Sequence, residues 1–543
     1  MINIMFFNII NRCLNFKIFL DKLKLNLLSN NNKLNKVEYL SGKIQQGVCC
    51  SLLLIMGSCA NEQTNKQPPN ILFCVADDAS YAHFGAYGCD WVKTPNFDRV
   101  SNEGILFTNA YTPNAKCAPS RSCIITGRNP WQLEAAANHW PYFPDKYKTV
   151  CEALRENGYE TAFTGKPWGP GKFKEGRELI GTRYDVKGET PTSEIENTDY
   201  AGSLNLFLKE RNKKKPFFFW YGGWEPHRYY EYGSGIEKGG KQLDMIKQTD
   251  IPSYWPDEEK VKTDMLDYAF ELEWFDLHLG KMIDLLEKQG LLENTMIVVT
   301  SDNGMPFPRV KGNPYEHSTH MPLAIMWKGK IINPRKVNHS LISFIDFAPT
   351  FLEAAGIDIA TSGMQPISGK SILNILTSEE ERNERKVLLQ GRERTDVGRP
   401  NDWGYPVRSI RKDSLLYLYN FHPERWPGGN PETDFRDTAP GPTKEAVIKS
   451  GESSVWWEAC LGLRPQEELY NLNQDQECMN NLCNTEAYVG IAAELKEELF
   501  QLLKKEGDPR MEGKDDYFDQ FPYINDTERG LYDRTILKMN KKR

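Results

Sequence analysis

The chain lacks an excess of basic residues, a recurring pair of closely spaced cysteines and an internal repeat. It has 67 lysines and arginines against 74 acidic residues, and its formal net charge of -7 argues against a general nucleic-acid binder. The 12 cysteines form no recurring Cys-x-x-Cys pattern, which argues against a structural zinc site. With 40% hydrophobic residues the composition is that of an ordinary soluble protein. An anionic substrate would therefore have to meet a local cluster of cations.

Long hydrophobic runs are missing too, and the apolar stretch at residues 47–58 is too short to span a membrane. Its length and the lysines before it are typical of a signal-peptide core. It ends in small residues before Cys59, a pattern that resembles the bacterial lipoprotein cleavage site. We expect residues 1–58 to be a leader and the protein to be exported to the periplasm or cell surface, with a lipid on Cys59. A plain cleavable signal is the alternative.

Four runs predict β-strands, and a continuous apolar run such as the first is typical of a parallel strand covered on both faces. They occupy residues 70–76, 159–164, 216–221 and 295–300. Helical patterns lie between them, as over residues 258–289, where apolar residues recur at three- and four-residue steps. Strands that alternate with helices predict an α/β fold with a doubly wound, mostly parallel sheet.

Polar or ionisable side chains follow each of these strands. In a doubly wound sheet, ligands bind beyond the carboxyl ends of the strands, so these side chains are expected to meet. Adjacent carboxylates repel one another at neutral pH unless a cation lies between them, and oxygen ligands favour calcium or magnesium over zinc. The residues, in strand order, are Asp77 and Asp78, then Lys166, then His227, then Asp302 and Asn303.

A cysteine stands at the predicted start of a helix, in the run Cys117-Ala118-Pro119-Ser120-Arg121. Pro119 suits the first turn of a helix, so Cys117 is expected near a helix N-terminus, where partial positive charge favours anions. Arg121 lies four residues further on and returns to the same face of the helix. A lone cysteine is more often a small buried apolar residue, so this run alone does not establish a site.

Taken in order, these motifs resemble those of the sulfatase family in the alkaline-phosphatase superfamily. The motifs are Asp-Asp after the first strand, Cys-x-Pro-Ser-Arg with a Thr-Gly-Arg tail, and then Gly-Lys, Pro-His and Ser-Asp-Asn-Gly after later strands. Residues 225–228 and 303–308 look closest to the branch that holds heparan N-sulfatases and bacterial polysaccharide sulfatases of the ulvan type. Residues 468–472 resemble the C-terminal subdomain of the family.

The resemblance implies a domain division. After the leader we expect a linker over residues 59–69 and an N-terminal sulfatase catalytic domain over residues 70–385, with an alkaline-phosphatase-like sheet. A smaller C-terminal α+β subdomain would follow over residues 386–543. This division agrees with a length that suits one large domain and a smaller one.

The resemblance also implies that Cys117 is oxidised to formylglycine (3-oxoalanine) by a formylglycine-generating maturation enzyme. The hydrate of this aldehyde would supply the nucleophile, because a sulfated hemiacetal can collapse to the aldehyde and free sulfate. One calcium ion would orient the nucleophile and polarise the sulfate. Its ligands would be Asp77, Asp78, Asp302, Asn303 and the modified Cys117.

Further roles follow from the same resemblance. Arg121 would hold the formylglycine hydrate, and Lys166 and Lys311 would neutralise the sulfate oxygens as charge develops. His227 would protonate the leaving oxygen or nitrogen. Without the surrounding motifs, a histidine at a strand end is more often a structural residue.

One departure from the family pattern concerns a histidine that many sulfatases carry shortly after the Gly-Lys motif. Here Lys166 is followed by Pro167 and Trp168, so another residue would have to act as the base. His139 is one candidate; it would otherwise contact substrate or only pack. His317 and His320, which follow Lys311 closely, are further candidates for the sulfate pocket. The alternative is that they lie in a surface loop.

The expected substrate is a sulfated polysaccharide or its oligosaccharides, either algal, such as ulvan, or a glycosaminoglycan. The chemistry would be hydrolysis of a sulfate ester. A sulfamidase acting on N-sulfoglucosamine, a phosphatase or phosphonate hydrolase of the same fold, and an inactive glycan-binding lipoprotein are the alternatives. No nucleic-acid partner is expected, and a membrane would be met only through the N-terminal lipid.

Overall fold

The computed structural model describes residues 68–379 and 385–542, and the chain from Pro68 onward folds as one compact unit. The predicted leader, Cys59 and most of the predicted linker lie outside the described residues. Within the described part, no helix combines the length and the apolar character that crossing a membrane requires.

A nine-stranded sheet lies at the centre of this unit, in the order β4-β3-β5-β1-β6-β7-β2-β8, with β9 beside β2. Among its described strands only β7 runs against the others, since it pairs antiparallel with both β6 and β2. The strands are β1 Asn70–Ala76, β2 Ile105–Tyr111, β3 Glu160–Gly165, β4 Thr182–Arg183, β5 Phe217–Gly222, β6 Thr295–Ser301, β7 His320–Met326, β8 Lys336–Asn338 and β9 Ile342–Ser343.

The four predicted strands are confirmed as β1, β3, β5 and β6. Every residue of β1 is buried, because β5 and β6 flank it and helices cover both faces. Val75 pairs with Gly222 of β5, and Ala76 pairs with Ser301 of β6. The carboxyl ends of these three parallel strands therefore lie at one edge of the sheet.

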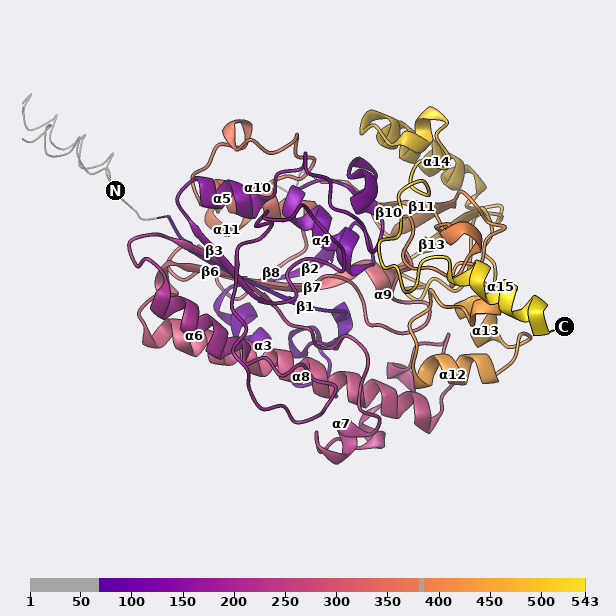
Figure 1. Cartoon of the computed structure of the whole chain (residues 1–543), viewed down its shortest axis with the longest axis horizontal. Coiled ribbons are helices and arrows are strands. Elements are labelled where there is room, and N and C mark those ends of the chain that lie inside the picture. The colour runs from indigo at the N-terminus through magenta and orange to yellow at the C-terminus, as the bar shows by residue number, and fades with distance from the viewer. Residues whose placement is uncertain (1–67, 380–384, 543) are drawn as a thin grey trace, which may run out of the picture. The chain divides into compact units, whose positions relative to one another are not determined.

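Helices cover the two faces of the sheet (Figure 1). On one face, α3, α6 and α8 enclose a core with the even-numbered side chains of β1, such as Leu72 and Cys74. On the other face, α4, α5, α10 and α11 pack on the odd-numbered ones, such as Phe73. This alternation follows from the two-residue period of a strand. The helices are α3 Pro95–Glu103, α4 Cys117–Thr126, α5 Val150–Glu156, α6 Tyr200–Glu210, α7 Ser234–Glu237, α8 Glu259–Lys288, α9 Glu316–Thr319, α10 Phe347–Ala354 and α11 Leu373–Thr377.

A second sheet of four antiparallel strands follows, in the order β10-β11-β12-β13. Its apolar face packs on α14 and on Trp131 and Ala137, which come from the segment after α4. The elements are β10 Val387–Arg392, β11 Val407–Lys412, β12 Leu415–Asn420, α12 Pro442–Lys449, α13 Val455–Leu461, β13 Glu467–Asn471, α14 Val489–Lys505 and α15 Leu531–Lys542.

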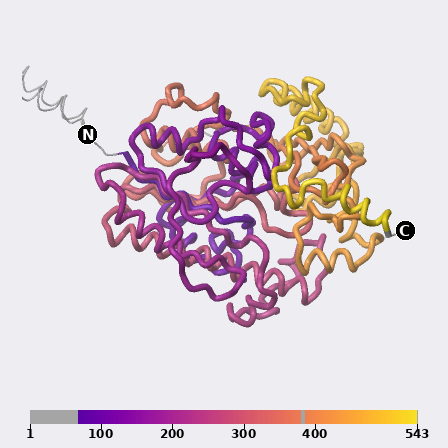
Figure 2. The backbone as a smooth tube through the Cα atoms, in the orientation of Figure 1, coloured from indigo at the N-terminus to yellow at the C-terminus, as the bar shows by residue number. Residues whose placement is uncertain are grey.

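The C-terminal stretch before α15 runs back along the segment after α4, as the yellow and purple tubes in Figure 2 show. The backbone N–H of Ile524 donates to the carbonyl oxygen of Trp140 at 3.2 Å. The predicted fold class, a mostly parallel α/β sheet with a smaller C-terminal α+β part, is confirmed. The boundary predicted at residues 385 and 386 stays a prediction.

Candidate active site

The carboxylates that follow β1 and β6 converge with the first residue of α4. One ligand atom from each of Asp77, Asp78, Cys117 and Asp302 lies within 4.8 Å of the other three, and all four residues are buried. The backbone N–H of Asp78 donates to Oδ1 of Asp302 at 3.1 Å. The register of β1 with β6 brings about this meeting, because both strands end at the same level.

Arg121 crosses beneath this cluster one turn into α4. Its Nε donates to Oδ2 of Asp302 at 2.7 Å, and a terminal nitrogen lies 3.4 Å from Oδ1 of Asp77. The same guanidinium donates to the carbonyl oxygen of Lys166. Burial disfavours the charged guanidinium, yet Asp302 and Asp77 raise the pKa of Arg121 above its usual range. Arg121 therefore remains a cation that links three loops of the site.

Two lysines reach the carboxylates from other loops. Nζ of Lys166 lies 2.5 Å from Oδ2 of Asp77, and Nζ of Lys311 lies 2.5 Å from Oδ2 of Asp78. Burial raises the pKa of Asp77, but Lys166 and Arg121 together outweigh it and hold that pKa well below its usual range. The carboxylate is therefore ionised at neutral pH.

The donor set fits a hard divalent cation. Asn303 Nδ2 donates to Oδ1 of Asp78 at 2.7 Å, while its own Oδ1 is buried with no hydrogen-bond partner among the described residues. Burial raises the pKa of Asp302 to about 7; Arg121 opposes this rise, and the charge of Asp77 adds to it. A cation would satisfy the amide oxygen and offset the crowded carboxylates, and oxygen donors of this kind suit calcium.

The thiol of Cys117 is a poor nucleophile as it stands. Burial, aided by the charge of Asp77, raises its pKa above the usual range. Because the thiolate is the reactive form of cysteine, a neutral buried thiol has little nucleophilic character. This environment suits a cysteine that becomes reactive only after a covalent modification of its side chain.

His227 presents one ring nitrogen to the same carboxylates. Its Nδ1 lies 2.6 Å from the carbonyl oxygen of Arg228, which can only accept, so Nδ1 carries the proton. Nε2 then faces Oδ2 of Asp78 at 3.8 Å. Burial, followed by the charge of Lys311, lowers the pKa of His227 to about 4. In this state the ring is neutral, and Nε2 is free to accept a proton.

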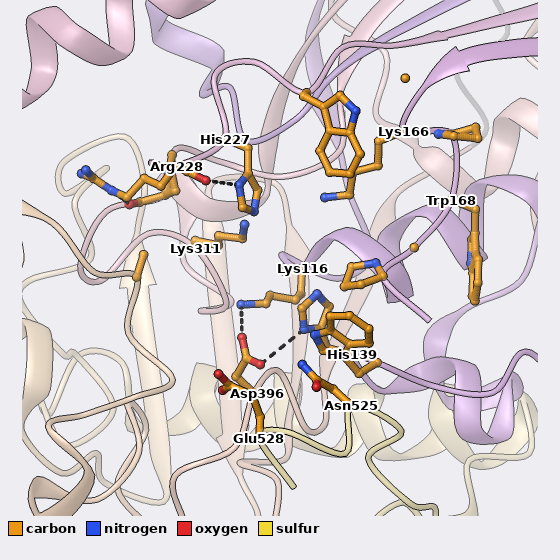
Figure 3. Close-up of a pocket in the computed structure, with 18 of the residues that line it drawn as sticks. Lys116, His139, Lys166, Trp168, His227, Arg228, Lys311, Asp396, Asn525 and Glu528 are labelled. Atoms are coloured by element: carbon orange, nitrogen blue, oxygen red, sulfur yellow. Dashed lines mark hydrogen bonds and ion pairs between the residues drawn. The ribbon is translucent and has the colours of Figure 1, made fainter. Parts of the chain in front are cut away.

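A pocket of about 770 Å³ opens in front of these groups. Lys166, Lys311 and His227 line it, and Cys117 and the carboxylates are buried behind them. Figure 3 shows the two lysines and His227 at one side of the pocket, with Lys116, His139 and Asp396 beside them. The pocket walls also carry aromatic rings, those of Trp140, Phe163, Trp168, Phe173, Trp224, Tyr229 and Tyr523.

A comparison with protein families identifies the family to which the chain belongs. The family model described as Sulfatase matches residues 69–357, which is more than half of the chain. The chain belongs to the sulfatase family. The predicted family is confirmed, and with it the prediction that the chain is a hydrolase.

Known sulfatases with similar sequences support the same assignment. This sulfatase is 26% identical over 505 residues to an ulvan-active sulfatase of Formosa agariphila, with 84% of this chain and 78% of the relative covered. It is 24% identical over 500 residues to human N-sulphoglucosamine sulphohydrolase, with 85% and 94% covered. A solved structure of a protein in complex with its substrate D-glucosamine-2-N,6-O-disulfate has the same fold, with a TM-score of 0.58, 21% identity and coverage of 82% and 100%.

The predicted site residues of this sulfatase fall into two groups. In the first group, the structure brings the metal-ligand candidates together with Arg121, Lys166, His227 and Lys311. His139 lines the same pocket. His320 does not: its ring lies between Tyr81 and Tyr111, and its nitrogens contact Glu316 and the carbonyl oxygen of Thr108. Its contact with substrate stays a prediction.

Trp168 lies in the run after Lys166, which contains no histidine. Its Nε1 donates to Oγ of Ser122 at 2.9 Å, and its ring packs against Phe143 and Phe173. The side chain therefore forms part of the wall of the pocket and offers no base.

Sequence reasoning missed two residues that line the pocket of this sulfatase. Lys116 directly precedes Cys117, and that adjacency was the one signal available for it. Asp396 follows β10 in the second sheet and pairs with Lys116 at 2.9 Å across 280 positions of the chain. No local pattern could have linked them, because the pairing depends on how the two sheets pack.

Proposed function

We propose that this sulfatase hydrolyses sulfate esters on a sulfated polysaccharide or its oligosaccharides, with a formylglycine formed from Cys117 and one calcium ion. One observation carries the proposal: ligand atoms of Asp77, Asp78, Cys117 and Asp302 gather within 4.8 Å of one another, behind a pocket that Lys166 and His227 line.

Calcium held by Asp77, Asp78, Asp302 and Asn303 would polarise the sulfate and orient residue 117, and the hydrated aldehyde of that residue supplies a hydroxyl nucleophile. The cation also changes what the two lysines do. Once it balances the carboxylates, Lys166 and Lys311 no longer serve as their counterions. Their ammonium groups, which line the pocket, are then available to the sulfate oxygens.

The remaining residues position groups and move protons. Arg121 bonds to Asp302 and to the loop of Lys166, so it keeps the first turn of α4 in register with the cation ligands. His227 holds its Nδ1 proton on a backbone carbonyl and directs Nε2 to the pocket side of Asp78. A proton on Nε2 in the substrate complex would pass to the leaving oxygen, and the negative charge of the bound sulfate favours that protonated form.

A glycan substrate is supported by the walls of the pocket and by the relatives. Trp224, 36% exposed, and Tyr229, 59% exposed, flank His227 and offer faces on which sugar rings stack. By contrast, Trp220 and Tyr221 of β5 are buried in the core and have no such role. The names of two relatives give ulvan and N-sulfoglucosamine as their substrates. For this chain we favour a sulfate ester over an N-sulfate.

Maturation and location belong to the same proposal. A formylglycine-generating enzyme would have to act on Cys117 before folding completes, because the folded chain leaves that residue only 1% exposed. Export, and a lipid on Cys59, rest on the sequence of the leader. Fractionation of cells that express the full chain would place it in the envelope or contradict the export.

A mass spectrum tests the proposed nucleophile. The tryptic peptide that contains residue 117 should have the mass of formylglycine in protein made with the maturation enzyme, and the mass of cysteine without it. Sulfate release should follow the modified fraction and should vanish in Cys117→Ala. Sulfate release by Cys117→Ala at the wild-type rate would refute the mechanism.

A substrate screen tests the proposed specificity. Sulfated mono- and oligosaccharides, N-sulfoglucosamine and an aryl phosphate are offered to the same preparation. We expect sulfate release from sulfate esters to exceed both release from the N-sulfate and hydrolysis of the phosphate. Faster turnover of the phosphate would favour a phosphatase, and full modification with no turnover of any compound would favour a binding protein.

A further inference from the structure

The pocket contains a second polar cluster beside the catalytic groups. We propose that Lys116, His139 and Asp396 form a subsite that recognises uncharged hydroxyl groups next to the sulfate, so the favoured sugar carries a single sulfate within the pocket. The inference rests on the proposed sulfatase function and specifies which sugars that function accepts.

Asp396 is the centre of this subsite. Its Oδ2 lies 2.9 Å from Nζ of Lys116, and its Oδ1 accepts a hydrogen bond from the hydroxyl of Tyr523 at 2.6 Å. Burial raises the pKa of Asp396, but Lys116 and then His139 outweigh it and hold that pKa well below its usual range. The carboxylate is therefore ionised, and the ammonium of Lys116 balances its charge.

His139 has unused hydrogen-bonding capacity inside the pocket. The residue is 6% exposed and lines the cavity, yet neither ring nitrogen has a hydrogen-bond partner among the described residues. Nδ1 faces Oδ1 of Asp396 at 3.6 Å, which is longer than a hydrogen bond (Figure 3). Burial lowers the pKa of His139 to about 4, so its ring is neutral at pH 7 and has one donor and one acceptor. A hydroxyl group satisfies both kinds of partner, and a buried polar group without one is costly.

A second anionic group would find no uncompensated cation here. Each cation that lines the described pocket has a carboxylate partner, and only Lys166 and Lys311 would be released from theirs by the proposed calcium ion. Four arginines, in addition to Lys116, form such pairs at 2.5 to 2.7 Å. These pairs are Arg177 with Glu152, Arg183 with Asp185, Arg228 with Asp264, and Arg436 with Glu528. A second sulfate would therefore compete with a carboxylate for each of these cations.

The test compares sugars with an aryl sulfate that has no hydroxyl groups. The probes are 4-nitrophenyl sulfate, the monosulfated monosaccharide that the wild type cleaves fastest, and the disulfated form of that sugar. His139→Phe keeps a ring and removes both nitrogens. We expect it to lower kcat/KM for the monosulfated sugar by about tenfold to a hundredfold and to leave that for the aryl sulfate within about twofold.

Asp396→Asn gives an independent result, because it frees the charge of Lys116. We expect the ratio of kcat/KM for the disulfated sugar to that for the monosulfated sugar to rise by about tenfold. Asp434→Asn is the matched control: this carboxylate has a 79% exposed side chain, does not line the pocket and should leave both rates unchanged.

The outcomes separate the two proposals. A wild type that cleaves no sulfate from any probe contradicts the proposed function. Wild-type activity with a preference for the disulfated sugar overturns the subsite, as does an equal loss on sugar and aryl sulfate in folded variants. If one of the two variants fails to fold, the result of the other tests the subsite. If the aryl sulfate is not a substrate, the ratio of kcat/KM for the disulfated sugar to that for the monosulfated sugar tests it.

Discussion

At the scale of single residues, the site is a balance of buried charge. Asp77, Asp78 and Asp302 would repel one another strongly if they stood alone, and Arg121, Lys166 and Lys311 contact them at hydrogen-bond distance. Among the described residues, Oδ1 of Asn303 accepts no hydrogen bond from these cations or from any other group. A divalent ion would bind that oxygen and replace the lysines as partner of the carboxylates, which would leave the lysines for an anionic substrate in the pocket.

Calcium should therefore stabilise the folded chain as well as activate it. We expect EDTA to abolish sulfate release and to lower the melting temperature, because a ligand that binds only the folded state adds stability. The gain is about 3 kcal/mol at a hundred times the dissociation constant. Differential scanning calorimetry with and without calcium measures it.

A matched pair of variants separates this effect from the general loss of a buried carboxylate. Asp78→Asn should lose the calcium-dependent shift in melting temperature. Asp276→Asn, which removes a buried carboxylate that bonds to Asn96 and Phe97 and is not part of the cluster, should keep it. An equal shift in both variants would contradict the assigned ligands.

At the scale of elements, the ends of β3 and β5 show why a glycine precedes Lys166. Gly165 has a φ of +70°, and a Cβ atom there would lie 2.0 Å from the carbonyl oxygen of Gly222. The two strands therefore approach more closely than a side chain allows, and the backbone N–H of Lys166 donates to that same carbonyl at 2.8 Å. This close approach places the lysine against Asp77.

Gly165→Ala is expected to lower both stability and activity. The unfavourable positive φ and the collision together should cost about 2 to 5 kcal/mol of unfolding free energy, and Lys166 should move from its position. Chemical denaturation and kcat/KM are the measurements.

Gly158→Ala is the control for backbone strain alone. Gly158 also has a positive φ, +93°, but a Cβ atom there would meet nothing within 4 Å. We expect a loss of about 1 kcal/mol and unchanged kcat/KM. Equal losses in the two variants would show that the contact with Gly222 is unimportant.

At the scale of the whole molecule, the two sheets are joined by buried charge as well as by apolar packing. Glu316 of α9 accepts a hydrogen bond from Tyr111 of β2 at 2.9 Å and pairs with Arg411 of β11 at 2.5 Å. Burial raises the pKa of Glu316, but His320 and Arg411 outweigh it and lower that pKa to about 2. The pair thus links the main sheet to the second one.

This link predicts a pH-dependent contribution to stability. Because the folded pKa of Glu316 lies below the ordinary value of 4.5, its stabilising effect is complete above that value and is lost as the pH falls toward 2. The difference in unfolding free energy between wild type and Glu316→Gln should shrink by about 1 kcal/mol between pH 7 and pH 3.5. Denaturant titrations at each pH measure it, and a constant difference would contradict the assignment.

The sequence by itself determined four strands of the main sheet and the inner half of the site. Apolar runs located β1, β5 and β6, because a strand covered on both faces has few polar positions, and the more mixed run of β3 was located by the Gly-Lys motif at its end. The polar residues directly after those strands were predictable as neighbours, since parallel strands end at a common edge. The motifs taken in order, and not the run around Cys117 alone, carried the resemblance to the sulfatase family.

Only the tertiary structure decided the outer half. His139 and Asp396 meet because the second sheet packs on the segment after α4, and a contact between positions so far apart leaves no periodic signal. The pairing of β2 with β7 placed His320 between two tyrosines and outside the pocket, although it follows Lys311 closely in the chain. Local pattern determines which edge of an element a residue occupies, whereas the partner across a pocket depends on how whole elements pack.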